Sequence, residues 1–311
     1  MSQVKQKAID FLSKKFNPIE IATFAYTLLS AIYILCFYTK IQTPFELLLN
    51  RFAIVIGILV LSFWNSKNKA AVVEFARAIF PLALIIYWYP ETYYLNHGVL
   101  IPQLDAFFDQ LDISLFDCAP AIEFSKMLPQ PWISEIMYFA YFSFFLIYIY
   151  VGCLFFFKYR QHFYQTTFII LTGFFLFYII FIFVPVEGPQ FYWKYPENKV
   201  PEGCFFSKLM RFTQQMGEKP TGAFPSSHVG MTLIYLKVLF NVKSERKSFW
   251  IILPVALLLF ASTVYIKAHY LVDVVAAFVA APVIYWISRK LYEILNEHIF
   301  SSNYIENKNR E

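Results

Sequence analysis

The hydrophobic positions of this chain gather into long runs that short polar segments separate. Eight runs come close to the ~20 mostly apolar residues that a helix needs to cross a bilayer. Two of them, 46–64 and 226–242, are weaker than the rest, because Arg51 and Lys237 interrupt or flank them. The pattern predicts an all-α polytopic membrane bundle, with fewer, longer spans and re-entrant segments as the alternative. The predicted spans are 19–38, 46–64, 71–90, 132–157, 165–186, 226–242, 249–267 and 270–288.

The composition agrees with a membrane protein. Of the 311 residues, 59% are hydrophobic and only 15% are charged, whereas soluble domains carry roughly 25% charged residues. The first segment, 1–18, places apolar residues among four lysines, which suits either a cytoplasmic interfacial helix or a frayed basic tail. No nucleic-acid motif is visible, and the net charge of +5 is weak evidence for an acidic partner.

The distribution of charge predicts the orientation of the chain. Cytoplasmic loops of membrane proteins carry an excess of lysine and arginine. The basic segments at 5–15, 67–69, 158–160, 243–247 and 289–310 all fall on one side of an eight-span bundle. The long loops 91–131 and 187–225 fall on the other side, and the first of them is acidic. Both termini are therefore predicted to be cytoplasmic, and the two long loops extracytoplasmic (periplasmic or luminal).

The four cysteines have no close spacing to histidines, so neither a disulfide framework nor a metal site is expected. Cys118 and Cys204 lie in the two predicted outer loops. In an oxidising compartment they could form a disulfide, and otherwise they are two free thiols. No metal and no cofactor are expected for this chain.

Two histidines stand at the outer ends of one predicted membrane hairpin. His228 lies at the start of the span 226–242 and His269 follows the span 249–267, so the two imidazoles can face each other although they are 41 positions apart. His269 and Asp273 are spaced i, i+4, which places them on one face of a helix. A carboxylate there can orient the imidazole as a nucleophile. Ionisable groups beside hydrocarbon usually mark function, although a single interfacial histidine can also be a polar anchor.

Two further features near these histidines suit an anion. Ser226 and Ser227 suit the start of a helix, where free backbone N–H groups attract phosphate oxygens. Lys267 is a candidate phosphate ligand, with snorkelling from the end of its span as the alternative. Lys194 and Lys219 in the outer loop are other candidate cations.

The ordered set Pro225-Ser226-x-His228, then Ser262-x6-His269-x3-Asp273, resembles the type-2 phosphatidic acid phosphatase superfamily. The resemblance implies a six-helix phosphatase or phosphotransferase core over 132–290, after N-terminal spans and an outer loop (19–131) and before a cytoplasmic tail (291–311). Thr263 stands where that family has its phosphate-gripping arginine, and no Lys-x6-Arg-Pro motif is present.

These departures resemble the inositol phosphorylceramide synthase branch, whose third motif lacks that arginine as well. Gly188-Pro189-x-x-Tyr192 is similar to the first motif of the branch, and His269-Tyr270-x-x-Asp273 to its third. The resemblance implies a set of possible substrate-binding residues. They are Gly188, Pro189, Gln190, Tyr192, Ser262 and Tyr265.

The resemblance also implies a mechanism. His269 would attack phosphorus and form a phosphohistidine, with Asp273 orienting it, and His228 would act as acid and then base. Ser226 and Ser227 would hold phosphate oxygens. The expected function is transfer of a phospho-headgroup, plausibly inositol phosphate, to a sphingolipid or diacylglycerol-like acceptor. The alternatives are a lipid phosphate phosphatase and a catalytically silent membrane binding or transport protein. The expected partners are lipid substrates in the bilayer, with no obligatory protein partner.

Overall fold

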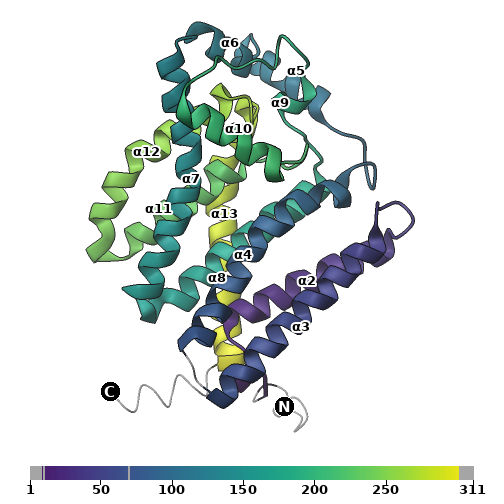
Figure 1. Ribbon diagram of the computed structural model, residues 1–311, viewed down its shortest axis with the longest axis vertical. Coiled ribbons are helices and arrows are strands. Elements are labelled where there is room, and N and C mark those ends of the chain that lie inside the picture. Colours follow the sequence, from purple (N-terminus) through teal and green to yellow (C-terminus); the bar gives the residue numbers. More distant parts are fainter. Residues whose placement is uncertain (1–8, 10, 69–70, 301–311) are drawn as a thin grey trace. The chain divides into compact units, whose positions relative to one another are not determined.

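The computed structural model describes residues 9, 11–68 and 71–300, and over these residues the fold is helical without β-strands (Figure 1). Seven helices in this part of the chain are long and apolar enough to cross a membrane. The chain is therefore an integral membrane protein. The spans lie in α2 (Pro18–Cys36), α3 (Pro44–Asn68), α4 (Ala71–Asn96), α7 (Pro131–Phe157), α8 (Arg160–Phe183), α12 (Arg246–Tyr265) and α13 (Leu271–Leu295).

The sixth predicted span, 226–242, forms a shorter helix. This helix is α11 (Ser227–Asn241), and its 15 residues correspond to about 22 Å at ~1.5 Å per residue, less than the ~30 Å of a hydrocarbon core. Its start matches the expected cap, because the Ser226 side chain accepts a hydrogen bond from the Val229 N–H. The prediction of a helix here is confirmed, and α11 is not among the seven helices with the length of a span.

The chain divides into two compact units. The first contains residues 1–87, 159–175 and 285–311, and half of the predicted interfacial segment 1–18 within it, residues 1–8 and 10, lies outside the described residues. The guanidinium group of Arg77 in this unit contacts the buried carboxylate of Glu20, with Nε and Oε1 2.7 Å apart. At the carboxyl end, α13 continues to Leu295 and a π-helical turn (Asn296–Phe300) follows, so part of the predicted tail is helical.

The second unit contains residues 88–158 and 176–284 and includes both motif histidines. Within it α12 packs against α7 and α11. Four short helices lie near the end at which α7 begins and α12 ends (Figure 1). The predicted outer segment 91–131 thus packs with the later segments of the chain. The short helices are α5 (Asp105–Phe116), α6 (Pro120–Met127), α9 (Pro189–Tyr192) and α10 (Phe205–Gly217).

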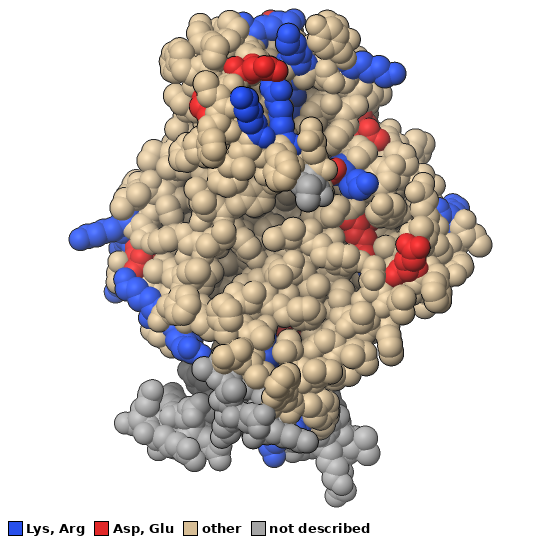
Figure 2. Space-filling model, in the orientation of Figure 1, with Lys and Arg blue, Asp and Glu red and all other residues tan. Residues whose placement is uncertain are grey.

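Charged side chains are sparse on the helices. Figure 2 shows wide areas of the visible face without Lys, Arg, Asp or Glu, and many large apolar side chains are exposed, as expected for helices that contact lipid. Cys118 and Cys204 are both free thiols.

The two long predicted outer loops contact each other within the second unit. The carboxylate of Asp105, at the start of α5, accepts hydrogen bonds from the N–H groups of Glu187 and Gly188, both at 2.9 Å. Lys158 and Glu245 pair at 2.7 Å at the far end of α12. The loops 91–131 and 187–225 therefore share one end of this unit, as the charge pattern predicts.

Helix α5 also provides the cap of α13. Both carboxylate oxygens of Asp112 accept hydrogen bonds at 2.9 Å, one from the N–H of Leu271 and one from the N–H of Val272. Asp112 and Asp105 are buried. Burial raises the pKa of both carboxyl groups, while the N–H donors oppose this shift. Asp112 therefore satisfies the first N–H groups of α13, which the helix itself leaves unpaired.

We expect Asp112→Ala to lower the free energy of unfolding by about 1–3 kcal/mol, because it leaves two buried N–H groups without an acceptor. Asp112→Asn keeps one acceptor oxygen and should lose less. Thermal and denaturant unfolding of the detergent-solubilised protein measure the difference. Ser114→Ala on the exposed side of α5 is the control, and equal stability of all three variants would contradict the capping role.

Candidate active site

Three segments that are far apart in sequence meet through backbone hydrogen bonds in the second unit. The N–H of Ala223 donates to the carbonyl of Val186 at 3.1 Å, and the N–H of Gln190 donates to the carbonyl of Lys267 at 2.8 Å. The N–H of Ser226 donates to the carbonyl of Asp273 at 3.1 Å. The structure thus brings together the segments 186–190, 222–228 and 262–273, which carry the three predicted motifs.

Glycine is required where the first segment crosses the other two. Gly188 has φ of +98°, a conformation that side-chain-bearing residues rarely adopt. A Cβ atom at this position would lie 2.7 Å from the carbonyl oxygen of Ala268 and 3.3 Å from the Cβ atom of Ala223. The close approach fixes the first segment directly beside the loop that carries His269.

The two motif histidines face each other. The ring centroids of His228 and His269 are 5.8 Å apart, and the rings are inclined by 64°. His228 lies in the first turn of α11, and His269 lies in the loop between α12 and α13. Two imidazoles at this separation can act on opposite sides of one small group, such as a phosphate.

A backbone carbonyl orients the His269 ring. Its Nδ1 atom is 2.8 Å from the carbonyl oxygen of Ala223 and 3.5 Å from Oδ2 of Asp273. The carbonyl can only accept, so Nδ1 carries the proton, and Nε2, which has no hydrogen-bond partner within the described residues, has its lone pair free. Burial lowers the pKa of His269 to about 4, against the opposing effects of Ala223 and the charge of Glu218. The ring is therefore neutral at pH 7.

Asp273 is only partly satisfied. Its Oδ2 atom accepts a hydrogen bond from the N–H of Tyr270 at 2.9 Å, while its buried Oδ1 atom has no hydrogen-bond partner among the residues that the structure describes. A buried carboxylate oxygen without a partner is costly. The short hydrogen bond to the His269 ring thus comes from the Ala223 carbonyl, and the Asp273 carboxyl group lies farther away, at 3.5 Å.

His228 has aromatic neighbours. Its ring centroid is 4.6 Å from that of Tyr141 and 4.5 Å from that of Phe144, both on α7. Its Nδ1 atom is buried and has no hydrogen-bond partner in the described part of the chain. Packing, rather than a hydrogen bond, therefore sets the orientation of this ring.

The two serines of the second motif have different surroundings. Ser226 is fully buried, and its hydroxyl caps α11 by accepting from the Val229 N–H at 3.3 Å. Ser227 begins the helix. Within the described residues the N–H groups of Ser227 and His228 make no hydrogen bond. These two N–H groups, beside the His228 ring, are available to an anion.

Two of the predicted substrate-binding residues bond to the protein itself. The buried hydroxyl of Ser262 donates to the carbonyl of Leu259. The hydroxyl of Tyr265 contacts Ser134 and donates to the carbonyl of Leu128, each at 2.8 Å. Tyr265 thus ties the end of α12 to the start of α7. Pro189 and Tyr192, by contrast, are the first and last residues of the short helix α9 that follows Gly188.

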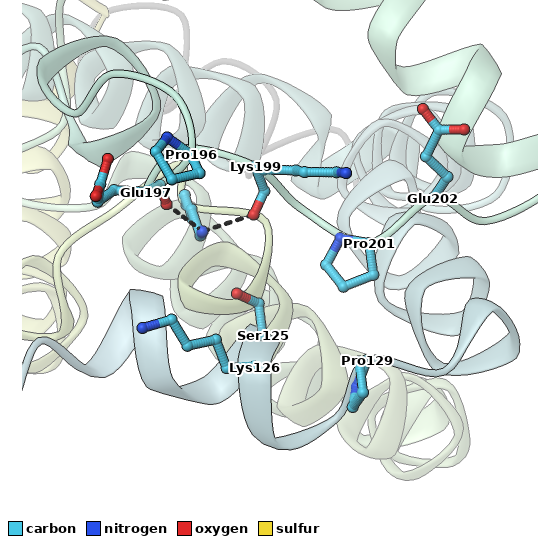
Figure 3. Close-up of a pocket in the computed structure, with 9 residues that line it drawn as sticks. Ser125, Lys126, Pro129, Pro196, Glu197, Lys199, Pro201 and Glu202 are labelled. Carbon is cyan, nitrogen blue, oxygen red and sulfur yellow. Dashed lines mark hydrogen bonds between the residues drawn. The ribbon is translucent and has the colours of Figure 1, made fainter.

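Lys267 points its ammonium group toward a neighbouring loop. This group donates hydrogen bonds to the carbonyl oxygens of Glu197 and Lys199, the second at 2.7 Å. Burial lowers the pKa of Lys267 to about 8. The side chain lines a pocket of about 750 Å³ (Figure 3), whose wall also includes Lys126 and Glu202. The structure therefore does not join the Lys267 ammonium to the histidine pair.

Sequence reasoning missed a polar cluster beside the histidines. Gln190 donates from Nε2 to Oε1 of Glu218 at 2.8 Å, and Gln214 donates from Nε2 to Oε1 of Gln190 at 3.2 Å. Burial raises the pKa of Glu218, and the amides and His269 oppose this shift. The i, i+4 spacing of Gln214 and Glu218 was the one available signal, since residues so spaced share a helix face.

The comparison with family models decides the family. The model of the PAP2 superfamily matches residues 112–287, more than half of the chain. The chain belongs to the PAP2 superfamily. The match begins in α5, at Asp112, and includes every motif described above. Comparisons with curated proteins and with solved structures found no match. The family of membrane phosphatases and phosphotransferases is thus established, and the match does not identify a branch within it.

We expect Gly188→Ala to reduce lipid turnover by about 100-fold, because the loop must shift away from Ala268 and a small misplacement near the chemistry has an effect of that size. Gly152→Ala is the matched control, since a Cβ atom at Gly152 on α7 meets nothing within 4 Å. Initial rates in mixed micelles measure both variants. Wild-type rates for Gly188→Ala would show that the close approach is unnecessary.

The pKa of about 4 predicts that His269 titrates far below the usual value of ~6.5. Because this lowered pKa favours the neutral ring in the folded state, the ring destabilises the fold relative to the unfolded chain as the pH falls from ~6.5 through about 4. NMR titration of protein labelled with ¹⁵N-histidine, with His269 assigned from a His269→Asn variant, tests the value. A midpoint near 6.5 would contradict it.

Proposed function

We propose that this protein is a lipid phosphotransferase that works through a phosphohistidine. It moves a phospho-headgroup, for which inositol phosphate is the first candidate, from a glycerophospholipid to a sphingolipid or diacylglycerol-like alcohol. The observation that carries the proposal is the pair of facing imidazoles, one of them neutral with a free nitrogen. Membership of the PAP2 superfamily supports the reaction class.

In the first step, Nε2 of His269 forms a bond to phosphorus, and the bond from phosphorus to the diacylglycerol oxygen breaks. His228 gives its proton to that oxygen. An anionic phosphate between the rings favours the protonated form of His228 before this step. The ring of His269 becomes positively charged, because Nδ1 keeps its proton, and the nearby Asp273 carboxylate, 3.5 Å away, balances that charge.

In the second step, His228 takes the proton of the acceptor alcohol, whose oxygen bonds to phosphorus while the bond to His269 breaks. The enzyme returns to its starting state, and the headgroup leaves on the new lipid. The free N–H groups of Ser227 and His228 at the start of α11 are suitable donors for the developing charge on the phosphate oxygens.

Neither of the two positions at which a cation was expected, Thr263 and Lys267, supplies a positive charge to the histidine pair. This favours transfer of a diester over hydrolysis of a monoester. Thr263 stands where the third motif of type-2 phosphatidic acid phosphatases has its arginine, and its hydroxyl donates to the Phe260 carbonyl at 2.8 Å. The ammonium group of Lys267 is bound by loop carbonyls. A phosphodiester carries one negative charge and therefore needs less compensation than a monoester.

We place the active site on the extracytoplasmic face, with both termini cytoplasmic. The basic loops and the shared end of the two long loops support this orientation. It requires α11 to pass through the membrane region together with α12, although α11 has only 15 residues. Accessibility of Cys118, and of a cysteine introduced as Lys308→Cys, to membrane-impermeant reagents in sealed vesicles tests it. Labelling of both from one side would contradict it.

The reaction class is tested with purified protein, phosphatidylinositol labelled in the headgroup phosphate, and either ceramide or diacylglycerol as acceptor. We expect a new lipid that carries the labelled headgroup. Release of free phosphate from lipid phosphates, without any headgroup-exchanged lipid, would contradict transfer and favour the phosphatase alternative.

His269→Ala should reduce turnover by at least ~1,000-fold and abolish the labelled phosphoenzyme, because it removes the attacking atom. His228→Ala should slow formation of the phosphoenzyme by about 100- to 10,000-fold, the usual contribution of a general acid. Rapid-quench trapping of labelled protein distinguishes the two effects. His162→Ala is the matched control, since this histidine is exposed in α8. Unchanged turnover in His269→Ala would exclude it as the nucleophile.

A further inference from the structure

The Glu218 carboxylate lies near the loop that carries His269, because its side chain bonds Gln190 at 2.8 Å and the Gln190 N–H donates to the carbonyl of Lys267 at 2.8 Å. Glu218 interacts electrostatically with His269 and with Tyr141, whose ring contacts that of His228. Glu218 and Asp273 are thus two carboxyl groups near the His269 ring.

Helix α10 and the first motif together hold the Glu218 carboxylate in place. At the start of α10, the Glu135 carboxylate of α7 accepts hydrogen bonds from the N–H groups of Cys204 and Phe206 at 2.6 and 2.5 Å. At its end, the N–H of Glu218 donates to the carbonyl of Gln214 at 2.8 Å. Gln190, next to Pro189 in the first motif, bonds the Glu218 side chain at 2.8 Å. Glu218 is thus positioned by α10 and by the first motif together.

We propose that Glu218 is a specificity residue that disfavours phosphomonoesters, admits phosphodiesters and binds a hydroxyl group of the transferred headgroup. The proposal rests on the phosphotransferase function and names its substrate class. A monoester carries about −1.5 to −2 charge at pH 7, and a diester carries one negative charge, so a fixed carboxylate repels the monoester more strongly. A carboxylate has about four lone-pair sites, so the Gln190 amide leaves sites for substrate hydroxyls.

The test compares wild type with Glu218→Gln, which removes the charge and keeps an oxygen for the Gln190 bond. Release of labelled diacylglycerol from phosphatidylinositol and from phosphatidate is measured in the same micelles. We expect the ratio of kcat/KM for phosphatidate to that for phosphatidylinositol to rise about 10-fold or more in the variant. Glu202→Gln, an exposed carboxylate paired with Arg211, is the matched control and should leave the ratio unchanged.

A pH profile separates repulsion from a structural role. The second ionisation of a monoester lies near pH ~6, so the same ratio should fall between about pH 5 and pH 8 more steeply in wild type than in Glu218→Gln. His228, His269, Asp273 and the α5 carboxylates are present in both proteins, so the difference in slope between the two profiles reports the charge of Glu218.

An unchanged ratio in Glu218→Gln, or an equal loss of both activities, would overturn the proposal and make Glu218 a structural support. Hydrolysis of both lipids without headgroup exchange would instead contradict the transferase function, while the ratio would still test Glu218. In the His269→Asn background, equilibrium binding of the two lipids gives the comparison without turnover. If the ratio of the two lipid affinities in His269→Asn is the same with and without the additional Glu218→Gln substitution, the proposal is overturned as well.

Discussion

The site depends on the burial of polar backbone in the loop between α12 and α13. This loop must carry His269 and start a helix, and buried N–H groups need acceptors. Asp112 provides them for Leu271 and Val272. Asp105 does the same for Gly188 and also accepts from the hydroxyl of Tyr270 at 3.2 Å. Two carboxylates of α5 therefore support both the first and the third motif.

The same constraint explains why the active site needs a segment outside the helical hairpin of the two histidines. Helices α11 and α12 bring the rings to one depth, but the acceptors for the loop that follows α12 come from α5. Phe108 of α5 packs with Val186, Ala223 and Tyr270 in one buried cluster. Apolar packing and carboxylate caps thus act together, and the acidic outer segment helps to build the candidate site.

Much of this site could be predicted from sequence, because its spacing follows from helix geometry. The rise of α11 and α12 predicts that His228 and His269 meet, and they do so at 5.8 Å. The Ala223 carbonyl could not be predicted, since any residue type offers a carbonyl oxygen. The contacts of Asp105 and Glu218 could not be predicted either, because their hydrogen-bond partners are 83 and 28 positions away in the sequence. For Lys267 the prediction failed in the opposite way. Its charge lies near the motif in sequence, but its ammonium group bonds the carbonyl of Lys199 instead of facing the histidines.

The proposed reaction cycle gives a physical reason for the unpaired oxygen of Asp273. In the resting site Oδ1 is buried without a donor from the described residues, while the neutral His269 ring offers its one N–H to Ala223. A phosphorylated ring is cationic, and its attraction to a carboxylate 3.5 Å away is strong in a medium of low dielectric constant. The cost of the resting carboxylate thereby lowers the relative free energy of the intermediate. In the proposed two-step transfer, this differential stabilisation, rather than tight binding of either lipid, would accelerate the reaction.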